Sequence, residues 1–98
     1  MDLQQDTRKL LLLVDDEPVN LRLLQQILQD DYRLLIAKDG PRALELAASA
    51  RPDLVLLDVM MPGMSGHEVC ERLKASPDTQ AMPVIFVTAL SEDTDEAR

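Results

Sequence analysis

Acidic side chains directly follow two apolar stretches of this sequence, where they could bind a divalent cation. The stretch LLLV is followed by three consecutive acids, Asp15, Asp16 and Glu17. Like charges repel, and at ~4 Å in an environment of effective dielectric constant about 20 each pair costs on the order of 4 kcal/mol. Full exposure to water or a bound cation must offset this cost. Carboxylate oxygens, including those of Asp58 after the later stretch DLVLL, are ligands that Mg²⁺ prefers.

The elements that must position these acids begin with short apolar runs. Such runs, bounded by polar or turn residues, are typical of parallel strands that are buried on both faces of a sheet. The sequence predicts four strands, at Leu10–Val14, Arg33–Ala37, Asp53–Leu57 and Val84–Val87.

Amphipathic helices are expected between the predicted strands. The first begins at Pro18, since proline is favoured in the first turn of a helix, and it carries apolar residues at helical spacing with polar residues such as Asn20 between them. A second helix is expected to start at the turn formed by Asp39 and the Gly-Pro pair after it. A third is expected at Ser65, which begins the S-x-x-E pattern of a capping box, and a fourth at Ser91.

The alternation of strands and helices predicts βαβ units with right-handed crossovers, and therefore an α/β fold around a parallel sheet. Ligands bind to such sheets beyond the carboxyl ends of the strands, at the topological switch point. Asp15 and Asp16 follow the first predicted strand, and Asp58 follows the third. Thr88 follows the fourth. If these strands are neighbours in the sheet, the four side chains open onto one crevice.

Length and composition restrict the function classes. A chain of 98 residues, 46% of them hydrophobic and 29% charged, is expected to fold as one soluble domain with a single core. Its net charge of −8 argues against direct binding to nucleic acid or to an anionic membrane. The single Cys70 permits no internal disulfide, and the apolar run Leu10–Val14 is too short for a signal peptide or a membrane span. We therefore expect a cytoplasmic protein.

Three motifs, VDDEP, LLDVMMPGMSG and VTA, occur in this order and at suitable separations. Together they resemble the receiver domain of two-component response regulators, over nearly the whole chain from about Leu10 onward. The resemblance implies the CheY-like, flavodoxin-like fold, a three-layer sandwich whose parallel sheet has the strand order 2-1-3-4. It assigns residues 1–9 to an N-terminal tail and residues 10–98 to the receiver domain.

The family fold continues beyond what these motifs cover. It has a fifth strand, a last helix and a lysine after the fifth strand that pairs with the phosphoryl group, and none of these is in this sequence. We therefore expect a receiver domain that is incomplete at its C-terminal end, in a chain that is either cut short or part of a longer protein.

The resemblance implies a Mg²⁺ site made of residues that follow the first and third predicted strands. Asp16 resembles the direct ligand of the ion, and Asp15 resembles the residue that assists through water. Asp58 and the backbone carbonyl of Met60 resemble the remaining protein ligands. The side chain of Met60 is therefore expected to matter little.

The resemblance also implies how a phosphoryl group is received. Asp58 resembles the phosphoacceptor, which attacks the phosphoryl group carried by a sensor histidine kinase or a phosphotransfer domain. Thr88 resembles the switch hydroxyl that turns toward the aspartyl phosphate, and Ala89 resembles the small residue that leaves room for the phosphodonor. Such a module is not an enzyme in its own right. It assists its own phosphorylation and dephosphorylation and switches a downstream output domain, and a homodimer is compatible with the resemblance.

Three other functions compete with this one. A receiver-like module that works only through protein contacts, without regulation by phosphorylation, would share the fold and differ in its response to Mg²⁺. A phosphohydrolase of the haloacid dehalogenase type is disfavoured, because those enzymes keep two acids in a DxD arrangement after the first strand, whereas here the acids are adjacent. A dinucleotide-binding domain is disfavoured because no Gly-rich turn follows the first strand.

Other residues near the motifs are expected to have structural roles. Glu17 is expected to act as an acid in the first turn of a helix, where the helix dipole favours a negative charge. His67 is expected to face the solvent, and the three methionines Met60, Met61 and Met64 to pack within their loop.

Overall fold

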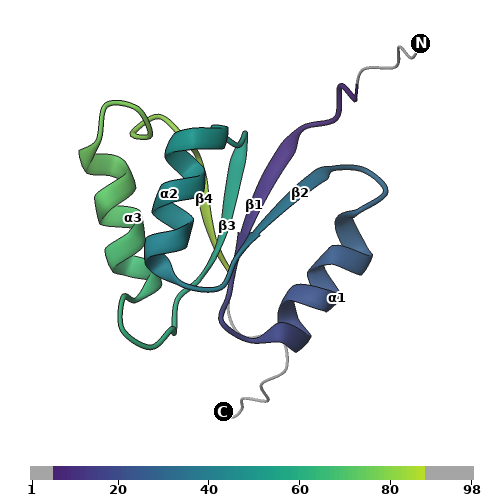
Figure 1. Ribbon diagram of the computed structural model, residues 1–98, viewed down its shortest axis with the longest axis horizontal. Coiled ribbons are helices and arrows are strands. Elements are labelled where there is room, and N and C mark those ends of the chain that lie inside the picture. The colour runs from purple at the N-terminus through teal and green to yellow at the C-terminus, as the bar shows by residue number, and fades with distance from the viewer. Residues whose placement is uncertain (1–5, 88–98) are drawn as a thin grey trace.

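A parallel sheet forms the centre of the structure (Figure 1). The computed structural model describes residues 6–87, and within them the strands are β1 (Leu10–Val14), β2 (Arg33–Ala37), β3 (Leu54–Asp58) and β4 (Val84–Val87). Their order in the sheet is β2-β1-β3-β4, and every adjacent pair is parallel. The α/β fold and the strand order 2-1-3-4 expected from the sequence are thereby confirmed.

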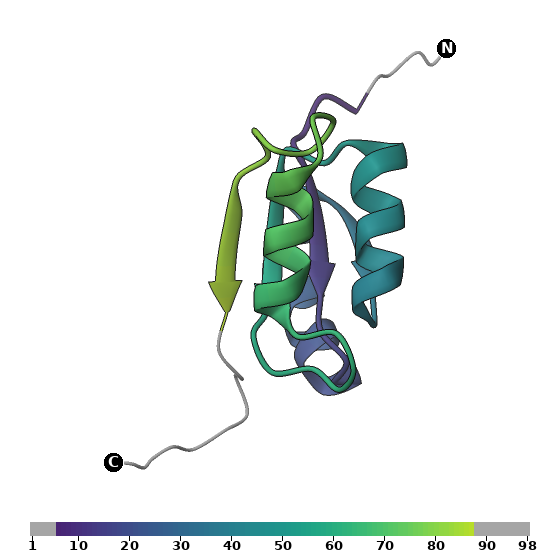
Figure 2. The same cartoon turned by 90° about the vertical axis from the view of Figure 1, so that its left-hand side faces the viewer.

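Helices cover both faces of this sheet. Those in the described residues are α1 (Pro18–Leu28), α2 (Gly40–Ala50) and α3 (Gly66–Ala75). Helix α1 lies on one face, whereas α2 and α3 pack side by side on the other, which gives the expected three layers (Figure 1, Figure 2). Within residues 6–87 no helix has the length and apolar character needed to cross a membrane. The helix start expected at Ser91 lies outside the described residues.

The core is divided between the two faces of the sheet because side chains alternate in direction along each strand. In β1, Leu12 and Val14 pack with residues of α2 and α3, whereas Leu11 and Leu13 pack against α1. None of these four side chains is more than 3% exposed. A strand that is buried on both faces must be apolar at successive positions, which accounts for the continuous run in the sequence.

Strand β3 begins and ends one residue later than the sequence predicts. Asp53 lies before the strand, where its Oδ2 accepts a hydrogen bond of 2.8 Å from the N–H of Leu10. Its own N–H donates to the carbonyl of Leu10 at 2.7 Å. The predicted strand Asp53–Leu57 was therefore misplaced by one residue, and Asp58 is the last residue of the strand. Apolar patterning cannot reveal this, because the role of Asp53 depends on how two distant segments align.

A first-turn proline or a side-chain cap marks the start of each described helix. Pro18 occupies the first turn of α1, as predicted. At the start of α2, the Oδ1 of Asp39 accepts a hydrogen bond of 2.8 Å from the N–H of Arg42. At the start of α3, the Oγ of Ser65 accepts one of 3.2 Å from the N–H of Glu68. The predicted starts of all three helices are confirmed.

Candidate metal centre

Three carboxylates meet at the edge of the sheet where its parallel strands end. One carboxylate oxygen of each of Asp15, Asp16 and Asp58 lies within 4.8 Å of the other two. Asp15 and Asp58 are each only 5% exposed, and Asp16 is half-buried. The structure therefore brings together three of the four side chains that the sequence places after strands.

The register of the sheet explains why these acids lie level with one another. Val14 of β1 is paired with Leu57 of β3, so the residues that follow them, Asp15 and Asp58, stand side by side on neighbouring strands. The N–H of Asp15 donates to the carbonyl of Ala37 at 3.2 Å, which extends the pairing of β1 with β2 by one residue. Both carboxyl groups are thus attached to backbone that is fixed by the sheet, at the lower end of the strands in Figure 1.

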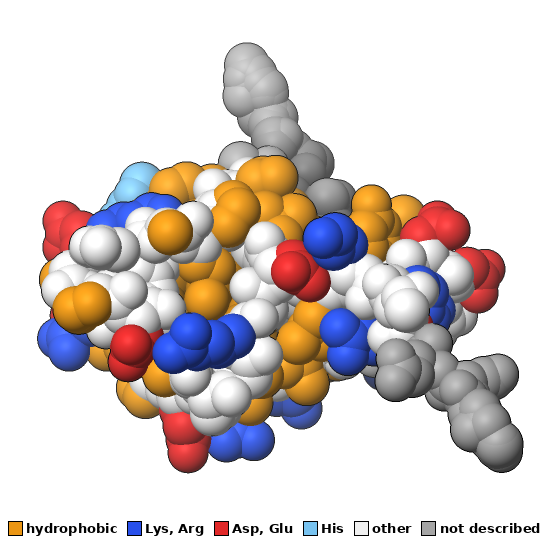
Figure 3. All heavy atoms as spheres, turned by 90° about the horizontal axis from the view of Figure 1, so that it is seen from above, with side chains coloured by type: hydrophobic (Ala, Val, Ile, Leu, Met, Phe, Trp, Pro, Cys, Tyr) orange, Lys and Arg blue, Asp and Glu red, His pale blue; other side chains and the backbone are white. Residues whose placement is uncertain are grey.

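The opposite edge of the sheet has a different character. Figure 3 views the molecule from that side, and there Lys and Arg side chains are scattered among Asp and Glu side chains and apolar surface. The buried acids Asp15 and Asp58 lie instead at the carboxyl ends of the strands, where α/β folds place their ligand sites.

Both oxygens of Asp15 accept hydrogen bonds within the first loop and α1. The N–H of Glu17 donates to Oδ1 at 2.9 Å, and Nδ2 of Asn20 donates to Oδ2 at 3.2 Å. Asn20 is 1% exposed, and its own Oδ1 is buried without a hydrogen-bond partner among the described residues. Helical periodicity places Asn20 among the polar residues of α1, so the sequence did not identify it. A polar residue one turn after the acid pair, on the helix that follows them, is the signal that could have done so.

The surroundings of Asp58 make its carboxyl group harder to ionise. Its pKa is raised from 3.8 to about 6, first by burial and then by the nearby negative charges of Asp15 and Asp16, while a backbone hydrogen bond from Met60 opposes the shift. A pKa that is raised by burial and by like charges means that the ionised group lacks a compensating positive charge. The side-chain charges that act on Asp58 are those of Asp15 and Asp16, which are negative. A bound cation would supply the missing positive charge.

The donor set fits a hard divalent ion. All three side chains offer carboxylate oxygens, which Mg²⁺ and Ca²⁺ prefer, and Mg²⁺ commonly uses one or two carboxylates together with several waters. The half-buried Asp16 provides the side of the site that solvent can reach, while Asp15 and Asp58 form its buried side. The residues present are therefore suited to hold Mg²⁺.

The loop between β3 and α3 is held firmly beside these acids. Gly63 in this loop has φ of 77°, in the left-handed region that favours glycine. Met64 packs against Gly40 at the start of α2, where a Cβ on Gly40 would stand 2.7 Å from the Met64 sulfur. Met61 is buried and Met60 is 79% exposed. Met61 is thus packed in the core and Met64 against it, in place of the expected packing within the loop. The Met60 side chain is exposed, contrary to the expected packing.

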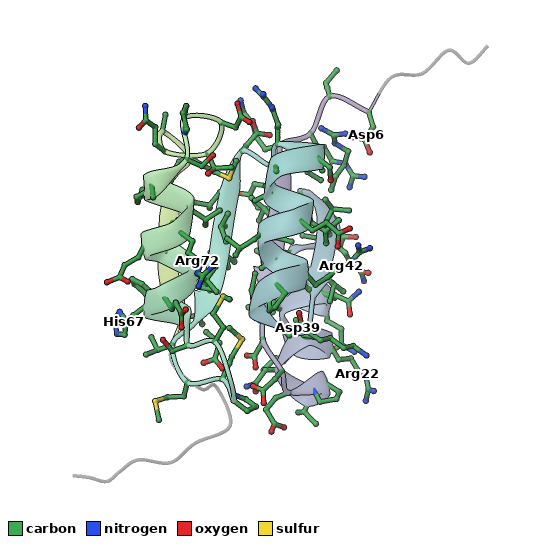
Figure 4. The ribbon with its side chains drawn as sticks, turned by 60° about the vertical axis from the view of Figure 1, so that its left-hand side comes forward. Asp6, Arg22, Asp39, Arg42, His67 and Arg72 are labelled. Carbon is green, nitrogen blue, oxygen red and sulfur yellow. The ribbon has the colours of Figure 1, made fainter. Side chains whose placement is uncertain are left out.

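Two of the sequence-predicted residues lie outside the part that the structure describes. These are Thr88 and Ala89, which follow β4 directly, and their roles stay predictions. His67 is exposed, as expected, and its ring contacts that of Phe86 on β4 with a centroid separation of 4.9 Å. In Figure 4 its side chain projects outward from the start of α3, and no metal-binding role is indicated.

Comparison with known proteins places these features in context. Residues 11–98 match the family model described as the response regulator receiver domain. Over 81 residues the chain is 49% identical to the response regulator PleD of Caulobacter vibrioides, which covers 82% of this chain and 18% of PleD. Over 95 residues it is 46% identical to a probable cyclic di-GMP phosphodiesterase of Vibrio cholerae, covering 97% of this chain and 21% of that protein. The chain thus spans about a fifth of the length of these relatives.

Solved structures show the same arrangement of elements. The N-terminal domain of a response regulator receiver protein from Methanoculleus marisnigri superposes with a TM-score of 0.80 at 38% identity, covering 90% of this chain and 72% of that one. The chemotaxis protein CheY4 of Vibrio cholerae gives a TM-score of 0.80 at 30% identity, covering 91% and 73% of the two chains. The similarity therefore extends over most of both chains in each comparison.

Proposed function

Because this chain belongs to the family of response regulator receiver domains, we propose that it is the phosphoacceptor module of a two-component phosphorelay, with Asp58 as the residue that is phosphorylated. The observation that carries the proposal is the cluster of Asp15, Asp16 and Asp58 at the carboxyl edge of the sheet. Receiver domains are signalling modules, and the chain is accordingly assigned no separate enzymatic activity.

The proposed reaction is a phosphoryl transfer to a carboxylate. An oxygen of Asp58 attacks the phosphorus atom of a phosphohistidine, the phosphorus–nitrogen bond breaks, and the histidine leaves with the electron pair of that bond. The product is an acyl phosphate on Asp58, whose reactivity suits a reversible signal. The donor is a sensor histidine kinase or a phosphotransfer protein.

The acid cluster supplies the electrostatic environment for this transfer. We propose that Mg²⁺ is held by Asp16 directly, by Asp58 and the carbonyl of Met60, and through water by Asp15. When bound, Mg²⁺ neutralises negative charge on the carboxylates and on the phosphoryl group. The fixed backbone of β3 keeps the Asp58 oxygen in place for attack.

The signalling consequences follow from the added charge. A phosphoryl group brings about two negative charges and three acceptor oxygens at neutral pH, and we propose that the hydroxyl of Thr88 turns toward it, with Ala89 leaving room for the donor. Residues 10–98 would act as the receiver unit of a cytoplasmic protein, whose output domain lies outside this chain. A homodimer is a further proposed state.

A small acyl-phosphate donor tests the assignment. Acetyl phosphate with Mg²⁺ should add one phosphoryl group to the wild-type chain, detected by intact mass, and a phosphopeptide map should place it on Asp58. Asp58→Asn should stay unlabelled. Asp39→Asn is the matched control, since Asp39 lies at the same edge of the sheet and asparagine also caps a helix.

Two outcomes would overturn the proposal. Equal labelling of the wild type and of Asp58→Asn would remove Asp58 from its role. An unlabelled wild type that also fails to bind Mg²⁺ would favour the alternative of a receiver-like module that acts only through protein contacts.

A further inference from the structure

Asn20 is a buried polar residue that touches the acid cluster from α1. Its side chain is 1% exposed, and Nδ2 donates to Oδ2 of Asp15 at 3.2 Å. Its Oδ1 has no hydrogen-bond partner among residues 6–87. Burying an unpaired amide oxygen is unfavourable, so the residue is poorly explained by stability alone.

The neighbouring residue shows what attaches α1 to the sheet. Leu21 is 3% exposed and packs with Leu11 and Leu13 in the apolar cluster beneath α1. An apolar side chain of similar shape at position 20 could extend such packing and would remove the unpaired Oδ1, at the cost of the hydrogen bond to Asp15. The specific contribution of Asn20 is therefore its hydrogen bond to Asp15.

That hydrogen bond completes the restraint of the Asp15 carboxylate. The N–H of Glu17 holds Oδ1 and Asn20 holds Oδ2, so the carboxylate cannot rotate without losing a bond. Each carboxylate oxygen has two lone pairs, and one on each remains available. Repulsion from Asp16 and Asp58 would otherwise favour rotation of Asp15 away from the cluster.

We propose that Asn20 is a positioning residue of the metal centre, which holds the Asp15 carboxylate ready for a hydrated divalent cation. The inference rests on the proposed function, because it concerns the same site. Mg²⁺ keeps several waters when proteins bind it, and a restrained Asp15 carboxylate is held ready to accept a hydrogen bond from one of them. Hydrogen-bond partners of metal ligands generally orient those ligands and raise the affinity for the metal.

The test measures Mg²⁺ affinity separately from stability. The dissociation constant for Mg²⁺ is determined by calorimetric titration for the wild type, for Asn20→Leu and for the control Leu21→Ala. Asn20→Leu should raise the dissociation constant about tenfold, the usual effect of losing a partner of a metal ligand. Leu21→Ala should lower the melting temperature and leave the dissociation constant within about twofold of wild type, because Leu21 packs in the apolar cluster beneath α1.

The Mg²⁺ dependence of the phosphorylation rate and an NMR signal distinguish a positioning role of Asn20 from a merely structural one. In phosphorylation by acetyl phosphate, Asn20→Leu should raise the Mg²⁺ concentration for half-maximal rate and leave the rate at saturating Mg²⁺ nearly unchanged. In the wild type, the side-chain NH₂ resonances of Asn20 should shift on addition of Mg²⁺, along the same titration curve as the backbone amide of Asp16. The second measurement needs no variant and applies even if Asn20→Leu does not fold.

The outcomes separate the two proposals. If the wild type binds Mg²⁺ and Asn20→Leu binds it equally well, or if the Asn20 resonances stay unmoved while that of Asp16 shifts, the positioning role is overturned and the phosphoacceptor function stands. If the wild type binds no Mg²⁺ at millimolar concentration, the proposed function itself fails, and the role of Asn20 fails with it.

Discussion

The backbone of Gly66, at the start of α3, lies directly against the carbonyl oxygen of Asp58 at the end of β3. A Cβ on Gly66 would overlap that oxygen and would stand 2.9 Å from the Cα of Val59. The N–H of Gly66 also donates to the carbonyl of Val59 at 3.0 Å. The start of α3 thus packs directly against the carbonyl of Asp58, the proposed phosphoacceptor, at a position that requires glycine.

Gly66→Ala should therefore disturb the position of Asp58. The methyl group can be accommodated only if the backbone of β3 or of α3 moves, and overpacking of this kind costs about 1–3 kcal/mol. We expect a loss of that size in the free energy of unfolding by urea, together with slower labelling by acetyl phosphate.

Gly40→Ala is the matched control for Gly66→Ala. A Cβ there would stand 2.7–2.9 Å from the Sδ, Cβ and Cγ of Met64, so the loop that carries Met64 must shift slightly, whereas at Gly66 the Cβ would overlap a backbone oxygen of β3. It should cost less than Gly66→Ala and leave labelling close to the wild-type rate. Equal losses of stability in the two variants would show that the contact between Gly66 and the Asp58 carbonyl is not what makes position 66 sensitive.

The raised pKa of Asp58 predicts how stability depends on pH when no divalent cation is present. The pKa is about 6 in the folded protein against 3.8 ordinarily, so between these values the folded state binds a proton that the unfolded state does not. The stabilisation from this group is fully present below about pH 4 and is lost as the pH rises through about 6.

Urea unfolding of the wild type and of Asp58→Asn, in a chelating buffer, measures this contribution. The variant lacks the titrating group, so the stability of the wild type relative to it should decrease from about pH 4 to about pH 7. A difference that stays constant over this range would show that the pKa of Asp58 is not raised.

Asp58→Asn should also distinguish the effect of charge repulsion on stability from the effect of cation binding. Without Mg²⁺ at neutral pH, Asp58→Asn should be more stable than the wild type by on the order of 1 kcal/mol, because it removes one of three crowded charges. At a Mg²⁺ concentration about 100 times the dissociation constant, the wild type should gain about 2.7 kcal/mol. The variant should gain clearly less.

Thermal melts with and without Mg²⁺ provide the measurement. Asp39→Asn should respond to Mg²⁺ as the wild type does, because Asp39 caps α2 and is outside the cluster. Equal stabilisation of the wild type and of Asp58→Asn by Mg²⁺ would mean that Asp58 does not contribute to the cation site.

The sequence was most informative where one property determined the structure. A run such as Leu11–Val14 is apolar at every position, as a strand covered on both faces requires, and it is too short for a helix. The sheet and its parallel topology could therefore be predicted. The acids at the strand ends could be assigned to one edge because parallel strands end together. The sequence alone therefore predicts that Asp15, Asp16 and Asp58 lie together.

The remaining features depend on contacts between segments that are distant in sequence. Asp53 appeared to belong to a strand, and only its bonds to Leu10 show that it precedes one. Asn20 follows the polar pattern of its helix, and its burial arises from the way α1 leaves β1. Gly66 has no side chain to give a signal, and its importance appears only when α3 is packed on the end of β3.

The pairing of β1 with β3 also has a consequence for the newly synthesised chain. Asp15 and Asp16 leave the ribosome long before Asp58 does, and until the two strands align they are an ordinary solvated acid pair. An ion that is shared by all three carboxylates can bind only after this alignment. Its binding would therefore report when β1 pairs with β3 during folding.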